Sequence, residues 1–354
     1  MSPTSGGIVS QVERDDFIIG RDDLILVTGA TGFVGSRVVE SLLDRGFRNI
    51  RCFTRSSTEA GWAGVQLVRG NLLSREDCIA ATENASVVLH LAAGRGEKSY
   101  PDAFMNSVVT TRNLLDACVQ HNCLKRFVNV SSFSVYTNPP KARQRLLDET
   151  CPVETNPELR GEAYCFAKAK QDEIVIEYAR KHSIPYVIVR PGVVYGPGNL
   201  AITGRVGIDN FGVFLHLGGS NPIPFTDVDN CADAIALAGL KEGIDDEVFN
   251  VVDDNPPSSR QFLRLYKRNV KRFTSFYVPH AVSYGLCYLW ELYSSWSEGQ
   301  LPPAFNRRRW RAFWKKTRYS NDKLKSRVGW LPRIPTEEGF RRYFEACRVG
   351  ESNA

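Results

Sequence analysis

The chain has 354 residues, enough for one large domain or two modest ones with a full hydrophobic core. Its formal net charge of +6 is mild for this length, so we expect no nucleic-acid partner, and small anionic ligands account for the excess. The nine cysteines form no Cys-x-x-Cys pair, which favours free thiols in a reducing cytoplasm. We expect no metal site, and the polar residues 1–20 predict a flexible tail rather than a signal peptide.

Strand and helix patterns alternate from Leu24 to about Pro197, which predicts an α/β fold with a doubly wound parallel sheet. The first strand, residues 24–27, is rich in branched apolar residues and typical of a strand buried on both faces. Apolar residues then recur at helical spacing over residues 33–43. A glycine-rich turn therefore joins a buried strand to a helix.

The three glycines of this turn have distinct roles. Gly29 permits the tight turn, Gly32 lets the backbone approach a phosphate, and Gly35 lets the helix pack closely on the strand. Unpaired backbone N–H groups and the positive end of the helix dipole would hold the pyrophosphate of a dinucleotide. An ordinary βα turn is the alternative, because the spacing is Gly-x-x-Gly-x-x-Gly rather than the commoner Gly-x-Gly-x-x-Gly.

The second strand, residues 50–55, ends without the carboxylate that usually binds the ribose hydroxyls of NAD. Thr54 stands at that position and Arg55 follows it. A missing carboxylate removes repulsion of a 2′-phosphate, and a guanidinium can bind that phosphate in a bidentate manner. The sequence thus predicts a preference for NADP, with NAD as the alternative and a solvated Arg55 as the simpler interpretation.

Two later strands end in polar or small residues. His90 lies inside the apolar run 87–93, and we interpret it as a structural residue because no partner acid is evident. The strand at residues 127–130 is followed by Ser131 and Ser132. Because ligands of open α/β sheets bind beyond the carboxyl ends of the strands, one of these hydroxyls can reach a substrate oxygen.

Tyr164 and Lys168 are four residues apart in a segment of helical pattern, so both side chains lie on one face. A free tyrosine has a pKa of about 10 and is a poor base at neutral pH. A neighbouring ammonium favours the phenolate, which can then take the proton of a substrate hydroxyl while hydride leaves its carbon. This pair predicts hydride transfer between a nicotinamide and an alcohol or ketone carbon.

With these motifs, the chain resembles the extended short-chain dehydrogenases/reductases, also called the NAD-dependent epimerase/dehydratase family, with some likeness to the hydroxysteroid-dehydrogenase and flavonol-reductase branches. The resemblance runs from about Leu24 to Asn255. It is carried by residues 28–35, 90–93, 106–115, 130–136, 163–168, 189–197 and 225–230.

The resemblance implies roles for individual residues. Ser132 would polarise the substrate oxygen, Tyr164 would be the acid/base, Lys168 would bind the nicotinamide ribose and tune the tyrosine, and Asn106 would position or relay. The residues that it implies for cofactor binding are Gly29, Thr31, Gly32, Phe33, Val34, Gly35, Arg55, Asn71, Leu72, Leu91, Ala92, Ala93, Lys168, Pro191 and Val193.

The chain also departs from the family's pattern. Asn71 replaces an acidic residue that often holds the adenine, and Phe133 with Ser134 replaces the Asp-Glu pair of the dehydratases, which argues against elimination chemistry. The arginine that grips the diphosphate in sugar-nucleotide epimerases is missing from residues 218–224, although Arg205 could substitute.

We expect a tail at 1–20 and a dinucleotide-binding domain at 21–198, to which 225–253 returns. A smaller, mostly helical substrate cap would comprise 199–224 and 254–354. Within the cap, residues 278–316 combine aromatic and basic residues. We favour packing of this segment on the core over contact with an anionic membrane surface.

The sequence thus predicts an NADP-preferring dehydrogenase or reductase of a small molecule with a hydrophobic portion. The alternatives are a sugar-nucleotide epimerase that retains NAD and a cofactor-sensing protein without catalysis. The resemblance is also compatible with a homodimer formed through two helices.

Overall fold

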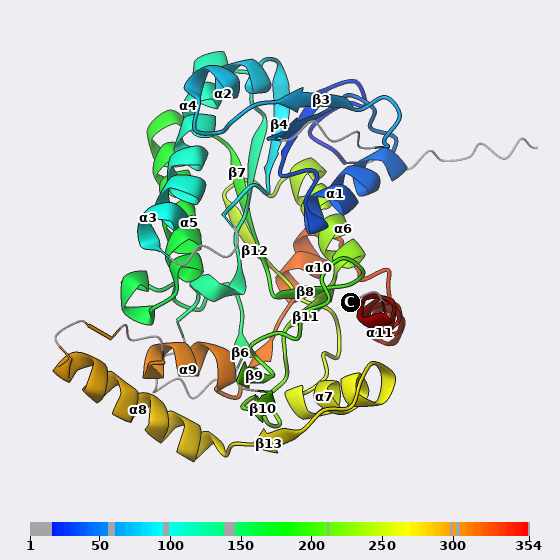
Figure 1. Cartoon of the computed structure of the whole chain (residues 1–354). Coiled ribbons are helices and arrows are strands. Elements are labelled where there is room, and N and C mark those ends of the chain that lie inside the picture. The colour runs from blue at the N-terminus through cyan, green and yellow to red at the C-terminus, as the bar shows by residue number, and fades with distance from the viewer. Residues whose placement is uncertain are drawn as a thin grey trace, which may run out of the picture.

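The structure is a computed structural model that describes residues 16–55, 61–94, 99–137, 146–210, 212–297, 300–301 and 305–352. Its centre is a seven-stranded sheet in the order β12-β7-β5-β4-β1-β2-β3, with every neighbouring pair parallel (Figure 1). The strands are β1 (Leu24–Thr28), β2 (Ile50–Thr54), β3 (Gln66–Arg69), β4 (Ala85–His90), β5 (Arg126–Val130), β7 (Tyr186–Pro191) and β12 (Glu247–Val251). The strand order reverses at β1, so the predicted doubly wound α/β fold is confirmed.

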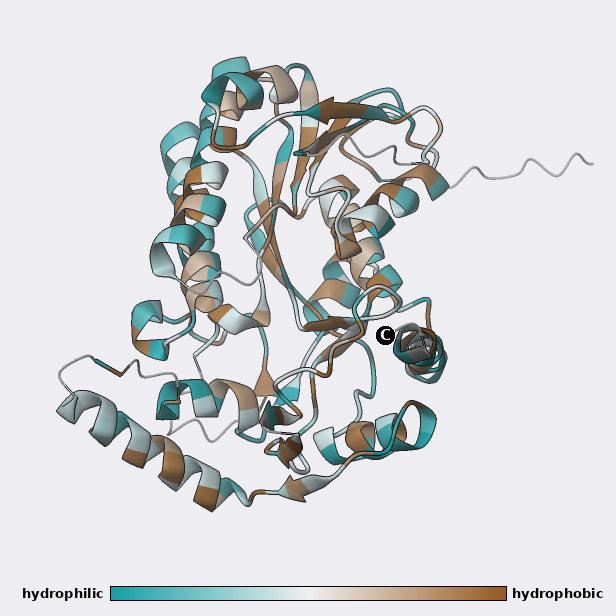
Figure 2. Cartoon of the chain, in the orientation of Figure 1, coloured by the Kyte–Doolittle hydropathy of each residue, from teal (hydrophilic) through white to brown (hydrophobic). Residues whose placement is uncertain are grey.

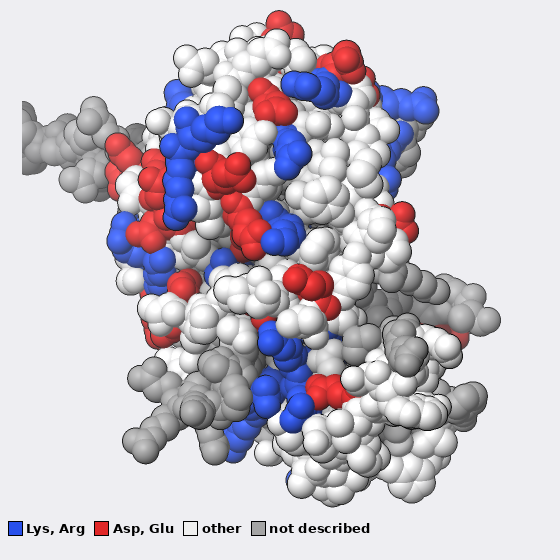
Figure 3. Space-filling model, turned by 90° about the vertical axis from the view of Figure 1, so that its left-hand side faces the viewer, with Lys and Arg blue, Asp and Glu red and all other residues white. Residues whose placement is uncertain are grey.

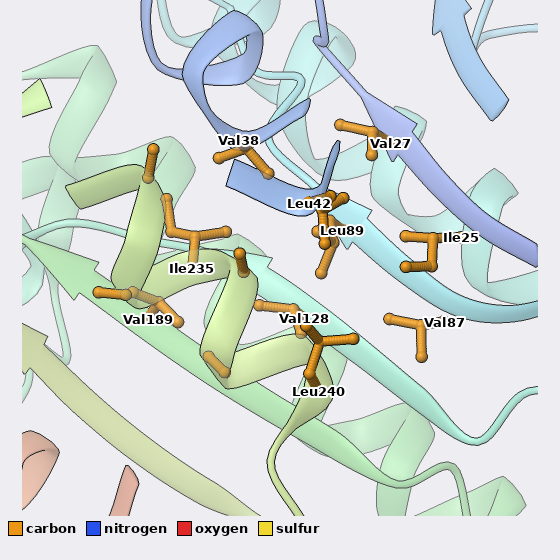
Figure 4. Packing of buried hydrophobic residues seen from close by; sticks show 14 of the residues in the cluster. Ile25, Val27, Val38, Leu42, Val87, Leu89, Val128, Val189, Ile235 and Leu240 are labelled. Carbon is orange, nitrogen blue, oxygen red and sulfur yellow. The ribbon is translucent and has the colours of Figure 1, made fainter. Parts of the chain in front are cut away.

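Helices cover both faces of this sheet because side chains alternate along each buried strand. Ile25 and Val27 of β1 pack into one core cluster with Val38 and Leu42 of α1 and with Ile235 of α6 (Figure 4). Leu24 and Leu26 belong to the cluster on the other face. The first face carries α1 (Phe33–Asp44) and α6 (Val228–Leu240), and the second carries α2 (Arg75–Thr82), α4 (Thr110–His121) and α5 (Ala163–His182).

Smaller elements build the cap beyond the carboxyl ends of the strands (Figure 1). A three-stranded sheet has the order β13-β10-β9, and β8 pairs with β11 and β6 with β14 in two-stranded sheets. The strands are β6 (Leu146–Leu147), β8 (Val193–Tyr195), β9 (Gly207–Asn210), β10 (Val213–His216), β11 (Phe225–Asp227), β13 (Ser275–Tyr277) and β14 (Arg318–Tyr319). The helices of the cap are α7 (Ser259–Asn269), α8 (His280–Trp296), α9 (Arg307–Trp314) and α11 (Thr336–Ser352), and α10 (Asp322–Val328) follows α9 in the chain.

Four short helical turns complete the described chain. They are α3 (Tyr100–Ala103), the π-helix η1 (Phe104–Val109) and the 3₁₀ helices η2 (Phe133–Val135) and η3 (Pro157–Arg160). Among the described residues, no helix has the length and apolar character needed to cross a membrane.

Two expected boundaries need correction. Residues 1–15 of the predicted tail lie outside the described residues, but Phe17 pairs with Lys241 and Ile19 is buried in the main core. These apolar side chains fix residues 16–20 to the sheet domain. Likewise, Leu324 and Trp330 fall in the segment assigned to the cap, yet both are fully buried in the core cluster beneath the sheet, because α10 packs on β12 and α6.

The aromatic and basic segment at 278–316 also differs in part from the expectation. Helix α9 packs as expected, with Trp310 and Trp314 buried. Helix α8 packs on α9 through Ser283, Tyr284 and Cys287, but most of its large apolar side chains are exposed. The expected packing of α8 therefore holds for its inner side only.

Candidate active site

A cavity of about 900 Å³ lies beyond the carboxyl ends of the central strands, between the sheet and the cap. Every site residue that the sequence indicated lines it. These are Gly29, Thr31, Gly32, Phe33, Val34, Gly35, Arg55, Asn71, Leu72, Leu91, Ala92, Ala93, Asn106, Ser132, Tyr164, Lys168, Pro191 and Val193. The cavity walls thus combine the glycine turn, the hydroxyl-bearing strand end and the tyrosine–lysine helix in one space.

The glycine turn forms a cradle that side chains would fill. Gly29 has a φ of +71°, and a Cβ there would lie 2.9 Å from the Ala92 backbone nitrogen. A Cβ at Gly35 would lie only 2.1 Å from the Gly29 carbonyl oxygen. Helix α1 begins after Gly32, which has no side chain to cap the first turn, and that turn holds no acidic residue. Its exposed N–H groups and positive dipole suit a diphosphate.

The far end of the cavity contains Thr54, Arg55 and Asn71. Thr54 is the last residue of β2 and is buried, whereas Arg55 is exposed. The Asn71 side-chain oxygen accepts a hydrogen bond from the Leu73 amide at 3.0 Å, which orients the side chain within its own turn. Among the described lining residues there is no Asp or Glu, while Arg55 and Lys168 supply positive charge.

Ser132, Tyr164 and Lys168 line the part of the cavity next to the end of β5 and the start of α5. Tyr164 stands at the start of α5 with 45% of its surface exposed, whereas Lys168, one turn later, is only 4% exposed. The Lys168 ammonium donates to the Val130 carbonyl oxygen at 2.8 Å, which fixes it between α5 and β5. The Ser132 hydroxyl accepts from the Ser134 amide at 3.1 Å, a bond that does not use its own hydrogen.

This geometry can be set beside known proteins. Residues 25–251 match the model of the NAD dependent epimerase/dehydratase family. The chain belongs to this family. Members are nicotinamide-dependent enzymes of the extended short-chain dehydrogenase type, and the expected family, enzyme class and nucleotide-binding fold are thereby confirmed. The residue roles stay predictions.

Two relatives of this epimerase/dehydratase chain align with it over different shares of their lengths. A 2-alkyl-3-oxoalkanoate reductase of Stenotrophomonas maltophilia is 27% identical over 338 residues, covering 90% of this chain and 97% of that protein. A cinnamoyl-CoA reductase 1 of Oryza sativa subsp. japonica is 30% identical over 200 residues, or 53% of this chain, and the chain spans only 58% of its length. A solved UDP-glucose 4-epimerase of Thermus thermophilus, complexed with NAD, shares the fold, with a TM-score of 0.66 and 22% identity over 92% of this chain and 98% of that one.

Beneath the family's tyrosine–lysine pair lies a buried ion pair that the sequence analysis missed. Asp172, one turn after Lys168 on α5, accepts hydrogen bonds from the Arg190 guanidinium at 2.9 and 3.2 Å and from the Asn129 amide at 2.9 Å. All three residues are buried, and burial raises the pKa of Asp172. These contacts join α5 to β5 and β7, so they hold α5 against the sheet. The only signal in the sequence was a charged residue inside the apolar strand 186–191.

Asn106 lies in the π-helix η1 rather than in a regular α-helix. Such wide turns are rare and occur often at functional sites. Here η1 faces the cavity with Asn106, while Ser107 beside it is buried and its hydroxyl accepts from the Gly94 amide at 3.3 Å. The structure therefore brings Asn106 to the cavity wall, in the neighbourhood of residues 91–94.

His90 is absent from the lining residues and is fully hydrogen-bonded, in agreement with a structural role. Its Nδ1 lies 2.8 Å from the Thr28 hydroxyl and its Nε2 lies 2.9 Å from the Thr111 hydroxyl. Because Thr111 donates its one hydroxyl hydrogen to the Ser107 carbonyl at 2.6 Å, His90 Nε2 must carry the proton and Thr28 must donate to Nδ1. Burial lowers the pKa of His90 to about 3, so the ring is neutral.

Arg205 does not serve the cavity. Its guanidinium donates to the Ala312 carbonyl oxygen at 2.9 Å and lies 5.3 Å from the centre of the Phe313 ring, beneath α9. Cap residues that sequence reasoning did not indicate line the cavity instead. They are Asn199, Ala201, Thr203, Phe262 and Tyr343. No local motif marks these residues, because the fold alone brings them to the wall.

Proposed function

We propose that the protein is an NADP-preferring dehydrogenase or reductase that interconverts a secondary alcohol and a ketone. The observation that carries this proposal is the convergence of Ser132, Tyr164 and Lys168 on the cavity that also contains the glycine cradle. A cradle in which a Cβ would collide with backbone fits a closely approaching diphosphate. When bound there, a nicotinamide supplies or accepts the hydride.

The residues of this chain handle the substrate oxygen and its proton. In the direction of reduction, Ser132 donates a hydrogen bond to the carbonyl oxygen and Tyr164 gives it a proton as the carbon gains hydride. One C–H and one O–H bond form, and the carbon–oxygen double bond becomes single. Lys168, held by the Val130 carbonyl, stabilises the phenolate that remains. The reverse reaction uses the same groups in the opposite sense.

The cap wall supports a substrate with a hydrophobic portion. Ala201, Phe262 and Tyr343 of the cap belong to the cavity lining and are aliphatic or aromatic. The names of the two relatives describe reductases of a 2-alkyl-3-oxoalkanoate and of cinnamoyl-CoA. An apolar ketone is therefore the class to screen first, with NADPH consumption as the readout.

The preference for NADP rests on Thr54 and Arg55. No carboxylate occupies the end of β2, and the exposed Arg55 lines the cavity where a 2′-phosphate would lie. Thr54→Asp should reduce the ratio of NADPH to NADH affinity by about tenfold or more, since like charges would then face each other. Arg75→Ala is the matched control, because this arginine is 70% exposed and outside the lining. An unchanged ratio in Thr54→Asp would refute the preference.

A sugar-nucleotide epimerase is the second candidate, favoured by the shared fold of the solved epimerase complexed with NAD. The engagement of Arg205 under α9 argues against it, because this was the replacement for the missing diphosphate-binding arginine. Denaturing the purified protein and identifying any released nucleotide separates the two. Stoichiometric NAD would support the epimerase and overturn our proposal, whereas an empty protein that binds NADPH reversibly would support the reductase.

A further inference from the structure

Helix α8 exposes seven large apolar residues, of which five form a single row and Tyr288 and Leu292 lie beside it. Val282, Leu286, Leu289, Tyr293 and Trp296 follow one another at spacings of four, three, four and three residues, which places them on one face of the helix. Exposure reaches 57% at Leu286, 61% at Leu289 and 77% at Trp296. The residues that α8 buries are small: Ser283, Cys287 and Ser294. The helix thus has the reverse of the usual amphipathic arrangement.

The orientation of α8 is fixed by its inner face. Trp310 of α9 donates from its indole nitrogen to the Ser283 hydroxyl at 2.9 Å, and its ring lies 5.0 Å from that of Tyr284. At the other end, Glu291 pairs with Arg307 at 2.6 Å. These contacts span the helix and keep the apolar row turned away from the protein.

The neighbouring strand β13 continues the same surface. Phe276 and Tyr277 are exposed and lead directly into α8, and the two elements form one edge of the cap (Figure 1). The α8 ribbon is pale or brown with little teal over its length (Figure 2). We call this set the α8 face: Phe276, Tyr277, Val282, Leu286, Leu289, Tyr293 and Trp296.

The segment that carries most of the α8 face is rich in positive charge, although Arg308, Arg309 and Lys271 pair with carboxylates outside it. Residues 256–320 contain thirteen Lys and Arg but only two Asp and Glu, a net charge of +11 in a chain whose total is +6. The rest of the chain is therefore net negative, by five charges. Arg260 lies 5.2 Å from the Tyr277 ring and Arg307 lies 4.5 Å from the Tyr288 ring, so guanidinium groups border the apolar row. One group of blue side chains lies in the lower part of the view, next to a wide uncharged area, and the other charged side chains are spread over the upper half with both signs mixed (Figure 3).

We propose that the α8 face docks on an anionic lipid surface. Leucine side chains can enter the boundary between headgroups and acyl chains, tyrosine and tryptophan rings are favoured at that depth, and the surrounding arginines attract lipid phosphates. The helix has 17 residues with a buried polar side held by α9, so it lies flat on the surface rather than crossing it. This inference does not depend on the proposed reaction.

A second copy of the chain fits the α8 face less well. A closed pair would be isologous, so the same patch on both subunits would meet. Two segments of net charge +11 would then be brought together, which is electrostatically unfavourable. An anionic surface complements both the apolar row and the charge that surrounds it.

The test is co-sedimentation of the full chain with vesicles of phosphatidylcholine alone and of phosphatidylcholine mixed with phosphatidylglycerol. We expect binding to the mixed vesicles at low salt, weakened by about tenfold or more at high salt or without the anionic lipid. The double variant Leu286→Glu with Leu289→Glu should bind the mixed vesicles about a hundredfold more weakly. The control is Leu331→Glu, which replaces an equally exposed leucine outside the α8 face and should bind like the wild type.

Two results of the co-sedimentation would overturn the proposal. The wild type could fail to bind anionic vesicles, or the double variant could bind them as strongly as the wild type. Light scattering without lipid covers the remaining case. If the wild type is a dimer and the double variant a monomer, a second copy covers the α8 face and the proposal fails. Circular dichroism of the variants checks that these surface substitutions leave the fold intact.

Discussion

Helices α5 and α8 are both long, with 20 and 17 residues, yet they distribute their side chains in opposite ways. Helix α5 buries Lys168, Gln171 and Asp172 against the sheet and the cavity. Helix α8 buries Ser283, Cys287 and Ser294 and exposes leucine and tryptophan. The buried polar groups of α5 thus face the interior of the chain, whereas the large apolar side chains of α8 face outward, where we propose that they meet a lipid surface.

The sharpest test of this comparison is Tyr164→Phe, which removes the one hydroxyl that α5 presents to the cavity. Turnover should fall by about a thousandfold, because proton transfer is lost, while NADPH affinity stays within about twofold. Steady-state kinetics and a fluorescence titration measure the two quantities. Tyr178→Phe is the control on the same helix, since its hydroxyl donates to Asp116 and is absent from the cavity lining. Full activity in Tyr164→Phe would remove α5 from the chemistry.

Asp172→Ala tests whether the buried charge of α5 holds the helix in place. The unfolding free energy should drop by about 3–5 kcal/mol, because Arg190 would be left buried without its carboxylate. Urea denaturation followed by circular dichroism gives the value. Glu173→Ala, which breaks the exposed pair with Lys170 on the same helix, should change little. Equal effects of the two variants would show that burial of the ion pair is irrelevant.

The acid sensitivity of the sheet domain should depend on His90. Its folded-state pKa of about 3 lies below the ordinary 6.5, so the unfolded chain takes up a proton first as the pH falls. Stability contributed by the neutral ring is complete above pH 6.5 and is lost progressively toward pH 3, at a few kcal/mol in total. Between pH 3 and 6.5, the unfolding free energy of His90→Gln should therefore depend less on pH than that of the wild type, as measured by denaturation at each pH. An equal pH dependence in the two proteins would mean that His90 does not cause the loss of stability in acid.

Gly35→Ala tests the close backbone contact between Gly35 and Gly29 in the glycine turn. The new Cβ would lie 2.1 Å from the Gly29 carbonyl oxygen, so α1 must shift away from the turn. We expect a loss of about 1–3 kcal/mol in stability and a weakening of NADPH binding by about tenfold or more. Thermal melting with and without NADPH reports both effects. A variant that the cofactor still stabilises as much as the wild type would contradict the role given to this glycine.

The smallest change in stability is expected from a glycine-to-alanine substitution in α8. A Cβ at Gly285 would have no neighbour within 4 Å, and the residue lies inside a helix. Gly285→Ala should therefore raise the unfolding free energy by about 0.5–1 kcal/mol without altering turnover. A decrease in melting temperature would show that α8 is packed more closely than its exposure indicates.

The sequence was sufficient for the site elements that act locally. Gly29, Gly32 and Gly35 predict the cradle because a βα turn is set by backbone sterics over a few residues. Tyr164 and Lys168 predict a shared face because helical spacing is short-range. The doubly wound sheet follows from the alternation of buried strands and helices in chain order, which leaves few topologies to choose from.

Other features depend on contacts between distant segments. Asp172 and Arg190 are 18 residues apart on a helix and a strand, and the charge of Arg190 inside an apolar strand does not by itself say which carboxylate it meets. Phe262 and Tyr343 reach the cavity from cap helices far apart in the chain. The periodicity of α8 correctly indicates an apolar face, but it cannot tell whether that face meets the core or the outside. Only the position of α9, on the opposite side, decides this.

The hydrogen bonds around His90 have a fixed direction. Each hydroxyl or ring N–H has one hydrogen and donates it to the next member, from Thr28 to His90, to Thr111 and on to the Ser107 carbonyl. In such a chain each hydrogen stays on its donor, and because the pKa of His90 is low, the ring does not take up a second proton at neutral pH. In the proposed reaction, Tyr164 would instead exchange its proton with water, because 45% of its surface is exposed.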